Sequence, residues 1–500
     1  MYNDYYKSQK FNQACNEWSN VLCNNFITHS NKKFEVTDVG EFQNRIILGI
    51  AYPSTMEQII KFIKIANKFQ IPVYTVSGGK NWGMGSSKPV CDGCVIINLS
   101  HLNKIIEINE EYEYAVIESG VTVGALYNYL KNTNSELVAN VGGGGPQVTI
   151  VGNTLDRGSG IYGVKKLEEI LAIEAITGNG DVIRTGYWNL IKSSNDTTNI
   201  THFYPYGYGP DLRGLFIQSN MGIVTKMVTK LHKKQRNIIL HGIVSHDKLD
   251  QLVDTFKELR EKNVIGGGVT FFISSKKSKN PNVGLVLLNG SYNMMVSAKK
   301  EILNINQNLY NIKLEFFDSE NLDQEDVPTY IKDTIHRMYY GNSEKHYYLS
   351  KLSNKINKTS KSAKNLDLNT DIDSKINHLG FLVVNASCPF KGIIAKQVVQ
   401  TIQSVSEDFD IAFSDLGGYG LKFHAAMLFD RNNKNDCKKR HKLKNQLFNK
   451  LFDIGIYPQR LDIDNMGDFT DKYSKEYKSV LQSIKKSIDP NCILSPGRYI

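Results

Sequence analysis

The sequence has 500 residues, of which 41% are hydrophobic and 22% charged, and a formal net charge of +10. This length exceeds one ordinary hydrophobic core and predicts two domains or one large composite. No apolar run reaches the ~20 residues of a membrane span, the first residues lack the apolar core of a signal peptide, and the lysines are mixed with acidic residues instead of forming a basic stripe. We therefore expect a cytoplasmic globular protein that binds neither nucleic acid nor membrane.

The seven cysteines are scattered along the chain, as expected for reduced thiols in a cytoplasmic protein. Cys91 and Cys94 form a C-x-x-C pair, but no second pair of cysteines or histidines stands at zinc spacing. We expect no metal site.

The first predicted elements form a β-α-β unit. A helix is expected within residues 5–27, a strand within 45–53, a helix from the capping signal at 54–57 to about residue 69, and a strand over 71–76. The glycine-rich stretch SGGKNWGMGSS, residues 77–87, follows this strand directly.

Glycines at this density allow a backbone with φ > 0 that approaches a bulky ligand closely. Consecutive N–H groups in such a loop form an anion-binding concavity, to which Lys80 adds a positive charge. The loop is neither a Walker A motif nor a Rossmann Gly-x-Gly-x-x-Gly that opens a helix. Two interpretations stay open from the residues alone: a pyrophosphate seat and an ordinary glycine-rich surface turn.

The remaining sequence predicts two further groups of elements. Up to residue 236 it favours short strands at 95–99, 104–108 and 114–118, a helix at 123–132, a second glycine-rich stretch over 141–160, a hairpin turned at 178–180 and a strand within 216–232. Beyond residue 237 it favours strands at 238–245, 283–292, 378–386, 411–417 and 422–430 and helices at 250–262, 299–311 and 445–455, with a polar flexible excursion over 341–375.

Several of these stretches, in this order, resemble the family of vanillyl-alcohol oxidase and p-cresol methylhydroxylase. The stretches are GKNWGMGSSKP, LNKIIEINEEYEYAVIESGVTVGALYNYL, VGNTLDRGSG, GNGDVIRTG, YGYGPDLRGLFIQSNMGIVTK and the terminal DPNCILSPGR. The resemblance implies an α+β fold of two domains: an FAD-binding domain of the PCMH type with two α/β subdomains (1–236), and a cap domain with an antiparallel sheet (237–455). A C-terminal segment (456–500) would return to the FAD-binding domain.

The resemblance also implies FAD as the cofactor and assigns residues to it. The first glycine loop would hold the pyrophosphate, the second stretch would line the cofactor, the segment at 222–224 would pass its adenine end, and the terminal arginine would neutralise negative charge near the flavin or the substrate. The residues are Gly78, Gly79, Lys80, Asn81 and Gly83; Gly152, Asn153, Arg157, Gly158 and Gly160; Gly222, Ile223 and Val224; and Arg498.

In vanillyl-alcohol oxidase a histidine that enters a cap strand carries the flavin covalently. His378, within Asn377-His378-Leu379, occupies the equivalent place, so the resemblance implies a covalent histidyl-FAD through His378. The alternative is a strand-edge histidine without a chemical role.

The sequence departs from the phenol-oxidising relatives at the substrate. Met84 stands where they have a tyrosine, and Gln459 stands where a second tyrosine precedes their arginine, here Arg460. A carboxylate near the flavin would fall in the glycines at 142–145, and no histidine before Arg45 matches the one that assists flavin attachment. Arg460 keeps a fork of donors suited to a carboxylate, phosphate or enolate oxygen, and Tyr457 is a candidate substitute ligand for a phenol.

The implied reaction is hydride transfer from a C–H bond of a small or medium alcohol, phenol-like or secondary-metabolite substrate to the flavin, which needs a base for the accompanying proton. His424, with Asp415 and Tyr419 upstream, provides the candidates; the alternative for His424 is a satisfied core histidine. The expected partners are the substrate, O₂ or another electron acceptor, and a second copy of the chain in a homodimer.

Two competing functions stay open. A berberine-bridge-like or sugar oxidase of the same fold usually carries a second, cysteinyl link to the flavin, and no cysteine lies within residues 140–165. A flavin-binding protein without turnover is compatible with Met84 and Gln459, whereas the full set of cofactor loops argues against it.

Overall fold

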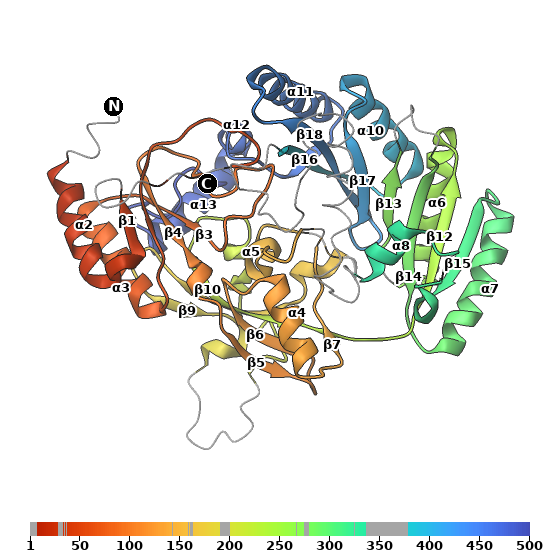
Figure 1. Ribbon diagram of the computed structural model, residues 1–500, viewed down its shortest axis with the longest axis horizontal. Helices are drawn as coiled ribbons and strands as arrows, with labels where there is room; N and C mark the ends of the chain where they lie inside the picture. The colour runs from red at the N-terminus through yellow and green to blue at the C-terminus, as the bar shows by residue number, and fades with distance from the viewer. Residues whose placement is uncertain are drawn as a thin grey trace.

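The computed structural model describes residues 8–28, 34, 36, 38–142, 144–158, 160, 164–190, 201–266, 268–274, 280–324, 326–336 and 379–500. These residues form two parts side by side, which Figure 1 shows with the N-terminal half in red to yellow and a large sheet in green and blue. None of the helices in the described ranges is long and apolar enough to cross a membrane. The excursion predicted at 341–375 and His378 lie outside the described residues.

The first subdomain is built on a four-stranded sheet of order β1-β2-β4-β3, in which β2, β4 and β3 are parallel. Its elements are α2 (Gln9–Leu22), β1 (Phe26–Thr28), β2 (Ile47–Ala51), α3 (Met56–Phe69), β3 (Val73–Val76) and β4 (Cys94–Asn98). The Thr55 side chain caps α3 by accepting from the Gln58 N–H. The apolar face of α3 packs against α2, where the Trp18 and Phe62 rings stack with centroids 4.6 Å apart.

The second subdomain has an antiparallel sheet of order β5-β6-β10-β8-β9. Its elements are β5 (Ile105–Asn109), β6 (Tyr114–Glu118), α4 (Val123–Asn132), β7 (Leu137–Val138), α5 (Ile150–Leu155), β8 (Ile170–Ile176), β9 (Val182–Arg184), β10 (Ile223–Lys230) and β11 (His232–Lys233). β7 and β11 pair separately. The hairpin predicted around Gly178-Asn179-Gly180 joins β8 to β9, and Gly180 has φ +87° as such a turn requires.

An eight-stranded antiparallel sheet, called the cap sheet below, has the order β15-β12-β14-β13-β17-β18-β16-β19. Its strands are β12 (Ile238–Val244), β13 (Thr270–Ile273), β14 (Asn282–Leu288), β15 (Lys313–Asp318), β16 (Leu379–Pro389), β17 (Asp410–Asp415), β18 (Gly420–Asp430) and β19 (Tyr457–Arg460). The helices of this part are α6 (Leu249–Glu261), α7 (Tyr292–Asn308), α8 (Thr329–Thr334), α10 (Gly392–Val405) and α11 (Lys434–Asp453).

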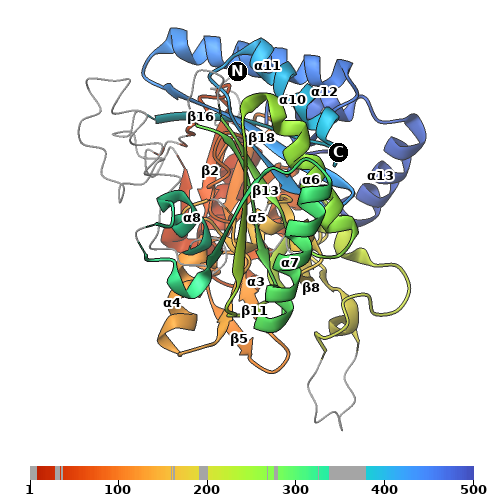
Figure 2. The same ribbon diagram turned by 90° about the vertical axis from the view of Figure 1, so that its right-hand side faces the viewer.

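The cap sheet has one face covered by helices and one face turned toward the N-terminal half. Figure 2 shows α6 and α7 in front of the sheet and α10 and α11 above it, and these helices share one hydrophobic core with alternate strand residues such as Phe423 and Ala425. The opposite face carries Phe381 and Val383, which contact the glycine loop at Gly83. The two-domain α+β architecture inferred from the sequence is confirmed.

The C-terminal residues leave the cap sheet and pair with the first subdomain. After α12 (Met466–Thr470) and α13 (Lys475–Ile488), Leu494 bridges Val73 of β3 in parallel, and Ile493 and Leu494 join the core of that subdomain. β19, which falls in the segment 456–500 of the predicted division, belongs to the cap sheet through its pairing with β16.

One buried carboxylate holds this tail in place. Asp489 is fully buried, accepts from the Ile493 and Leu494 N–H groups at 3.1 and 2.9 Å, and forms an ion pair with buried Lys485 at 2.7 Å. Lys485 in turn donates to the Leu494 carbonyl at 3.1 Å. The tail is therefore fixed by one interdependent polar cluster.

We predict that Asp489→Ala lowers the free energy of unfolding by about 3–5 kcal/mol, because it leaves the Lys485 charge buried without its partner. Urea denaturation measures the change. Asp471→Ala is the matched control, since Asp471 pairs with Lys478 on the surface, where a pair contributes about 0–1 kcal/mol. Equal losses in the two variants would contradict this account of the tail.

Candidate active site

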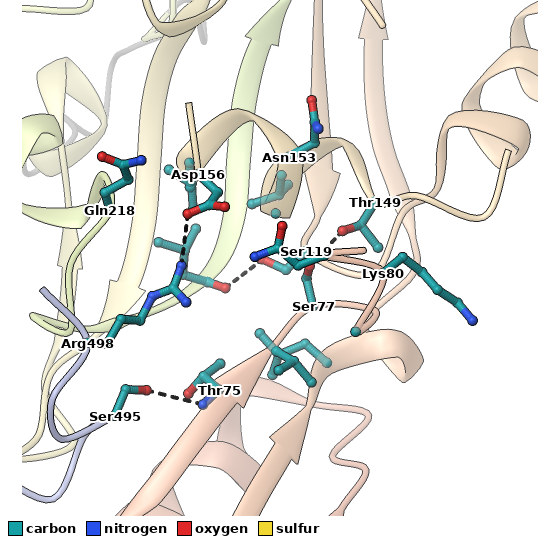
Figure 3. A pocket seen from close by; sticks show the side chains of 18 of the residues that line it. Thr75, Ser77, Lys80, Ser119, Thr149, Asn153, Asp156, Gln218, Ser495 and Arg498 are labelled. Carbon is teal, nitrogen blue, oxygen red and sulfur yellow. Dashed lines mark hydrogen bonds and ion pairs between the residues drawn. The ribbon is translucent and has the colours of Figure 1, made fainter. Parts of the chain in front are cut away.

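A deep cleft lies where the two subdomains, β19 and the C-terminal tail meet. Its walls are the end of β3 with the following loop, the residues that lead into and form α5, the segment before β10, and Ser495 and Arg498 of the tail. The carboxyl ends of parallel strands such as β3 are a common place for a ligand in α/β sheets. Figure 3 shows these side chains converging from several chain segments.

The two subdomains approach each other so closely in the cleft that glycine is required. The Ser77 and Thr149 hydroxyl oxygens are 2.6 Å apart (Figure 3), and a Cβ on Gly152 would lie 2.1 Å from the Ser77 oxygen. Gly79 has φ +68° and a Cβ there would overlap Ser87. The geometry of the cleft therefore leaves no room for a side chain at either position.

Asp156, at the end of α5, binds two arginines. Its Oδ1 accepts from Nη2 of Arg498 at 3.1 Å, and its Oδ2 accepts from Nε of Arg460 at 3.0 Å and also from Nη2. Figure 3 shows Arg498 and Asp156 directed toward each other. Arg460 also donates to Asn81 Oδ1 at 2.7 Å, and Arg498 donates to the Tyr74 hydroxyl at 3.1 Å.

This network carries a net positive charge in a buried place. Burial opposes the charged form of Arg498, but Tyr74 and Asp156 outweigh it and raise the pKa of the guanidinium above its ordinary value. One carboxylate between two guanidinium groups leaves one positive charge over, which suits an anionic or oxygen-rich ligand.

The cap sheet adds a row of polar side chains next to the cleft. His424 of β18 pairs with Asn385 of β16, and Asn385 pairs with Arg460 of β19. The amide of Asn385 contacts the Met84 sulfur at 3.6 Å, and Met84 and Arg460 line the cleft. Because side chains alternate along a strand, Lys422 lies on the same face as His424.

Burial lowers the pKa of His424 to about 4, and the charges of Lys422 and Arg460 lower it further. The imidazole is therefore neutral at pH 7 and has a lone pair that can accept a hydrogen bond or a proton. Within the described part of the chain no hydrogen bond to the His424 ring occurs.

The cleft brings together nine of the predicted cofactor and substrate residues. They are Gly79, Lys80, Asn81, Gly152, Asn153, Gly222, Val224, Arg460 and Arg498. Others lie just behind its wall. Four of them are glycines with no room for a side chain: a Cβ would meet Phe381 at Gly83, Asn153 at Gly158, Asn140 at Gly160 and Thr149 at Gly78. Ile223 lies in the core. The carbonyl of Arg157 accepts hydrogen bonds from Gln459 and Lys422.

Three predicted catalytic residues lie elsewhere. Asp415 is buried on the helix-covered side of the cap sheet and pairs with Arg260 of α6 at 3.2 Å. Tyr419 is 82% exposed in the turn between β17 and β18, and Tyr457 is 56% exposed with its ring against Phe452. The structure therefore groups His424 and Arg460 and separates them from the other three.

Four side chains at or beside the cleft were not expected from the sequence: Asp156, Ser77, Thr149 and Lys422. A signal existed for Asp156, because it precedes Arg157 in the stretch VGNTLDRGSG and two nearby arginines need a counter-charge. No signal in the sequence pointed to the hydroxyl pair of Ser77 and Thr149, which depends on the docking of two subdomains.

Comparisons with known proteins define the class. Residues 47–186 match the family model described as FAD binding domain. The structure of p-cresol methylhydroxylase with substrate bound has a TM-score of 0.81 over 98% of this chain and 97% of that one, at 22% identity; 4-ethylphenol oxidase from Gulosibacter chungangensis has 0.82 over 99% and 97%, at 20% identity. The chain thus has the fold of an FAD-binding flavoprotein.

Two proteins are similar to parts of the chain in sequence. The chain is 37% identical over 220 residues to the 4-cresol dehydrogenase [hydroxylating] flavoprotein subunit of Pseudomonas putida, a stretch covering 43% of this chain and 41% of that protein. It is 32% identical over 257 residues to 1'-carboxy-chondrochloren decarboxylase of Chondromyces crocatus, covering 51% and 45%. The matches thus span less than half of these relatives. Residues 47–186 therefore form an FAD-binding domain, and the chain has the fold of p-cresol methylhydroxylase.

The cleft fits FAD. The loop at Gly79 takes the left-handed backbone of an anion-binding concavity, as a pyrophosphate needs. The Ser86 hydroxyl lines the cleft and is buried without a hydrogen-bond partner in the described residues, and Arg498 supplies a fixed positive charge. A dinucleotide with two phosphates and polar ring edges suits these groups.

We predict that wild-type protein loses about 3 kcal/mol more unfolding free energy than His424→Gln between pH 6.5 and pH 4. The ordinary histidine pKa of 6.5 falls to about 4 in the fold, so the unfolded chain binds a proton that the folded chain rejects. This stabilisation is complete above pH 6.5 and is lost as the pH falls to 4. Urea denaturation at several pH values measures the difference.

The control is His101→Gln, because His101 is exposed and this variant should follow the wild type. If His424→Gln also follows the wild type through this pH range, the imidazole is not buried in a positive field and the account of the site is wrong.

Proposed function

We propose that the chain is an FAD-dependent oxidoreductase, an oxidase or dehydrogenase, that removes a hydride from a C–H bond of a small or medium substrate such as an alcohol or a phenol-like or secondary-metabolite compound. The observation that carries the proposal is the cleft itself, in which the cofactor loops of an FAD-binding domain meet Arg460 from a strand of the cap sheet. Bound FAD supplies the two-electron acceptor at its N5 atom.

The residues around the cleft would bind and orient the substrate. Arg460 is held rigidly by Asp156 and Asn81, so its guanidinium can fix an oxygen of the substrate without a loss of side-chain freedom. Met84, Val383 and Ala426 pack together where the cap sheet meets the glycine loop, which makes this side of the cleft apolar.

His424 is the candidate base in this proposal. It is neutral at pH 7, lies in the same strand row as Asn385 and Arg460, and can accept the proton that leaves as an alcohol is oxidised. Its low pKa makes it a weak base that releases the proton easily, so it suits a substrate whose own acidity is raised by Arg460.

The relatives cover both phenols and acids. The Pseudomonas putida and Gulosibacter chungangensis proteins are named for 4-cresol and 4-ethylphenol, whereas D-2-hydroxyglutarate dehydrogenase of Stutzerimonas stutzeri, 24% identical over 42% of this chain, is named for a hydroxy acid. Met84 removes a hydroxyl donor from the wall of the cleft, so a phenol has lost one of its ligands here.

The proposed activity is tested by screening the purified protein with alcohols, phenols and hydroxy acids, following O₂ consumption and the reduction of an electron-accepting dye. Anaerobic bleaching of the flavin by at least one compound is the expected result. A protein that holds flavin and is bleached by no member of any class would support the alternative of flavin binding without turnover.

We further propose that His378 carries the FAD covalently. Two features support this. His378 directly precedes β16 in the sequence, and Phe381, three residues further on, contacts Gly83 in the glycine loop. A covalent bond would keep the cofactor in place through acid denaturation.

The expected result is a yellow pellet after acid precipitation of wild type and of the control His101→Ala, and a yellow supernatant over a colourless pellet for His378→Ala. Absorbance of both fractions measures this. A yellow supernatant from the wild type would exclude the covalent bond, and a colourless native protein would exclude FAD itself.

A further inference from the structure

Lys422 is a buried lysine beside the cleft, and the carboxylate that acts on it, Asp156, is already paired with two arginines. It is 8% exposed, and its Nζ donates to the Arg157 carbonyl at 3.3 Å. Asp156, the residue before Arg157, lines the cleft. Within the described residues, Lys422 forms no ion pair.

Three charged groups act on Lys422, and two of them are positive. Arg460 of β19 and Lys166, which donates to Asn153 at 2.7 Å, are cationic, and His424 lies two residues along the same strand. The carboxylate of Asp156 is already bound by Arg460 and Arg498.

Lys166 and Lys422 are both buried, but the carboxylates that act on them differ. The charge of Lys166 is offset by Glu169, which is buried and itself binds Asn140 and His232. The carboxylate that acts on Lys422 is Asp156, which is already bound by both Arg460 and Arg498. Burial, followed by the charges of Arg460 and Lys166, lowers the pKa of Lys422 to about 7.

We propose that Lys422 binds a carboxylate of the substrate, so that the protein acts on a carboxylic acid held between Lys422 and Arg460. This inference rests on the proposed function and deepens it by naming the substrate class. The alternative ligand, a phenol, is neutral in water at pH 7 with a pKa near 10, whereas a carboxylate is already ionised at that pH and can pair with the ammonium form of Lys422. The Met84 wall beside Asn385 would contact the apolar part of such an acid.

Carboxylate binding should be coupled to proton uptake. Lys422 is mainly neutral at pH 8 when the site holds no anion, and an adjacent carboxylate favours the charged ammonium. Binding at pH 8 therefore draws close to one proton from the buffer, which a lysine with a purely structural role would not do.

The test is isothermal titration calorimetry of the purified full-length protein at pH 8, in two buffers of different ionisation enthalpy. The probes are lactate, phenylacetate and benzoate, each compared with its amide, together with phenol. We expect at least one acid to bind at least tenfold more tightly than its amide and to take up close to one proton.

Three variants complete the test. Lys422→Met should weaken that acid at least tenfold and abolish proton uptake, Lys422→Arg should bind it within about threefold of wild type without proton uptake, and the exposed control Lys391→Met should behave as wild type. Thermal melting identifies any variant that fails to fold, and Lys422→Arg then decides alone.

The proposal is overturned if no acid binds better than its amide, if Lys422→Arg still takes up the proton, or if only phenol binding depends on Lys422. Calorimetry does not require flavin, and the absorbance of the same samples reports it. Colourless protein would defeat the proposed function, whereas yellow protein without a preference for acids would defeat only the role of Lys422.

Discussion

The cleft depends on one carboxylate. Asp156 is 7% exposed and lies between Arg460 from the cap sheet and Arg498 from the tail. Two guanidinium groups this close to each other in a buried place would repel strongly without it. These ion pairs therefore join three distant stretches of chain at the cleft. Asp156 lies more than 300 residues before both arginines in the sequence.

Further contacts make this junction rigid. The Tyr499 hydroxyl accepts from the Leu461 N–H at 3.1 Å, and Gln218 donates to the Gln459 carbonyl at 3.0 Å. The residues flanking Arg460 are thus fixed by the tail on one side and by the second subdomain on the other. An arginine held in this way needs little reorganisation when it meets a ligand.

The sequence indicated the glycines of the cleft more directly than the side chains on the cap-sheet face, and the reason is physical. Gly79 and Gly152 are required by backbone geometry, which leaves a trace in local composition. Asp415 and Tyr419 lie near His424 in sequence, but Asp415 lies on the other side of the cap sheet, and Tyr419 lies in an exposed turn. Lys422 lies two residues before His424 on the same strand, so the alternation of side chains along a strand predicts that both lie on one face.

The predicted helices also differ in how far the local sequence determines their bounds. The helix at 123–132 has a polar cap and an apolar stripe and was predicted with the bounds observed for α4. α11 begins at Lys434, eleven residues before the predicted start. The prediction began too late because the first turns of this helix are rich in lysine and asparagine and show no apolar stripe. Their helicity depends on tertiary partners, such as the buried pair of Lys444 and Asp462 at 2.7 Å, which local periodicity does not encode.

Met84 lies where the glycine loop meets the cap sheet. Its side chain is 1% exposed and packs on Val383 and Ala426 of the cap sheet, so it belongs to the interface that closes the cleft. A hydroxyl donor is missing at this point of the loop, and the polar groups next to it, Asn385 and Arg460, come from the cap. In the proposed function, the glycine loop holds the cofactor and the cap sheet recognises the substrate, and the two parts meet at Met84.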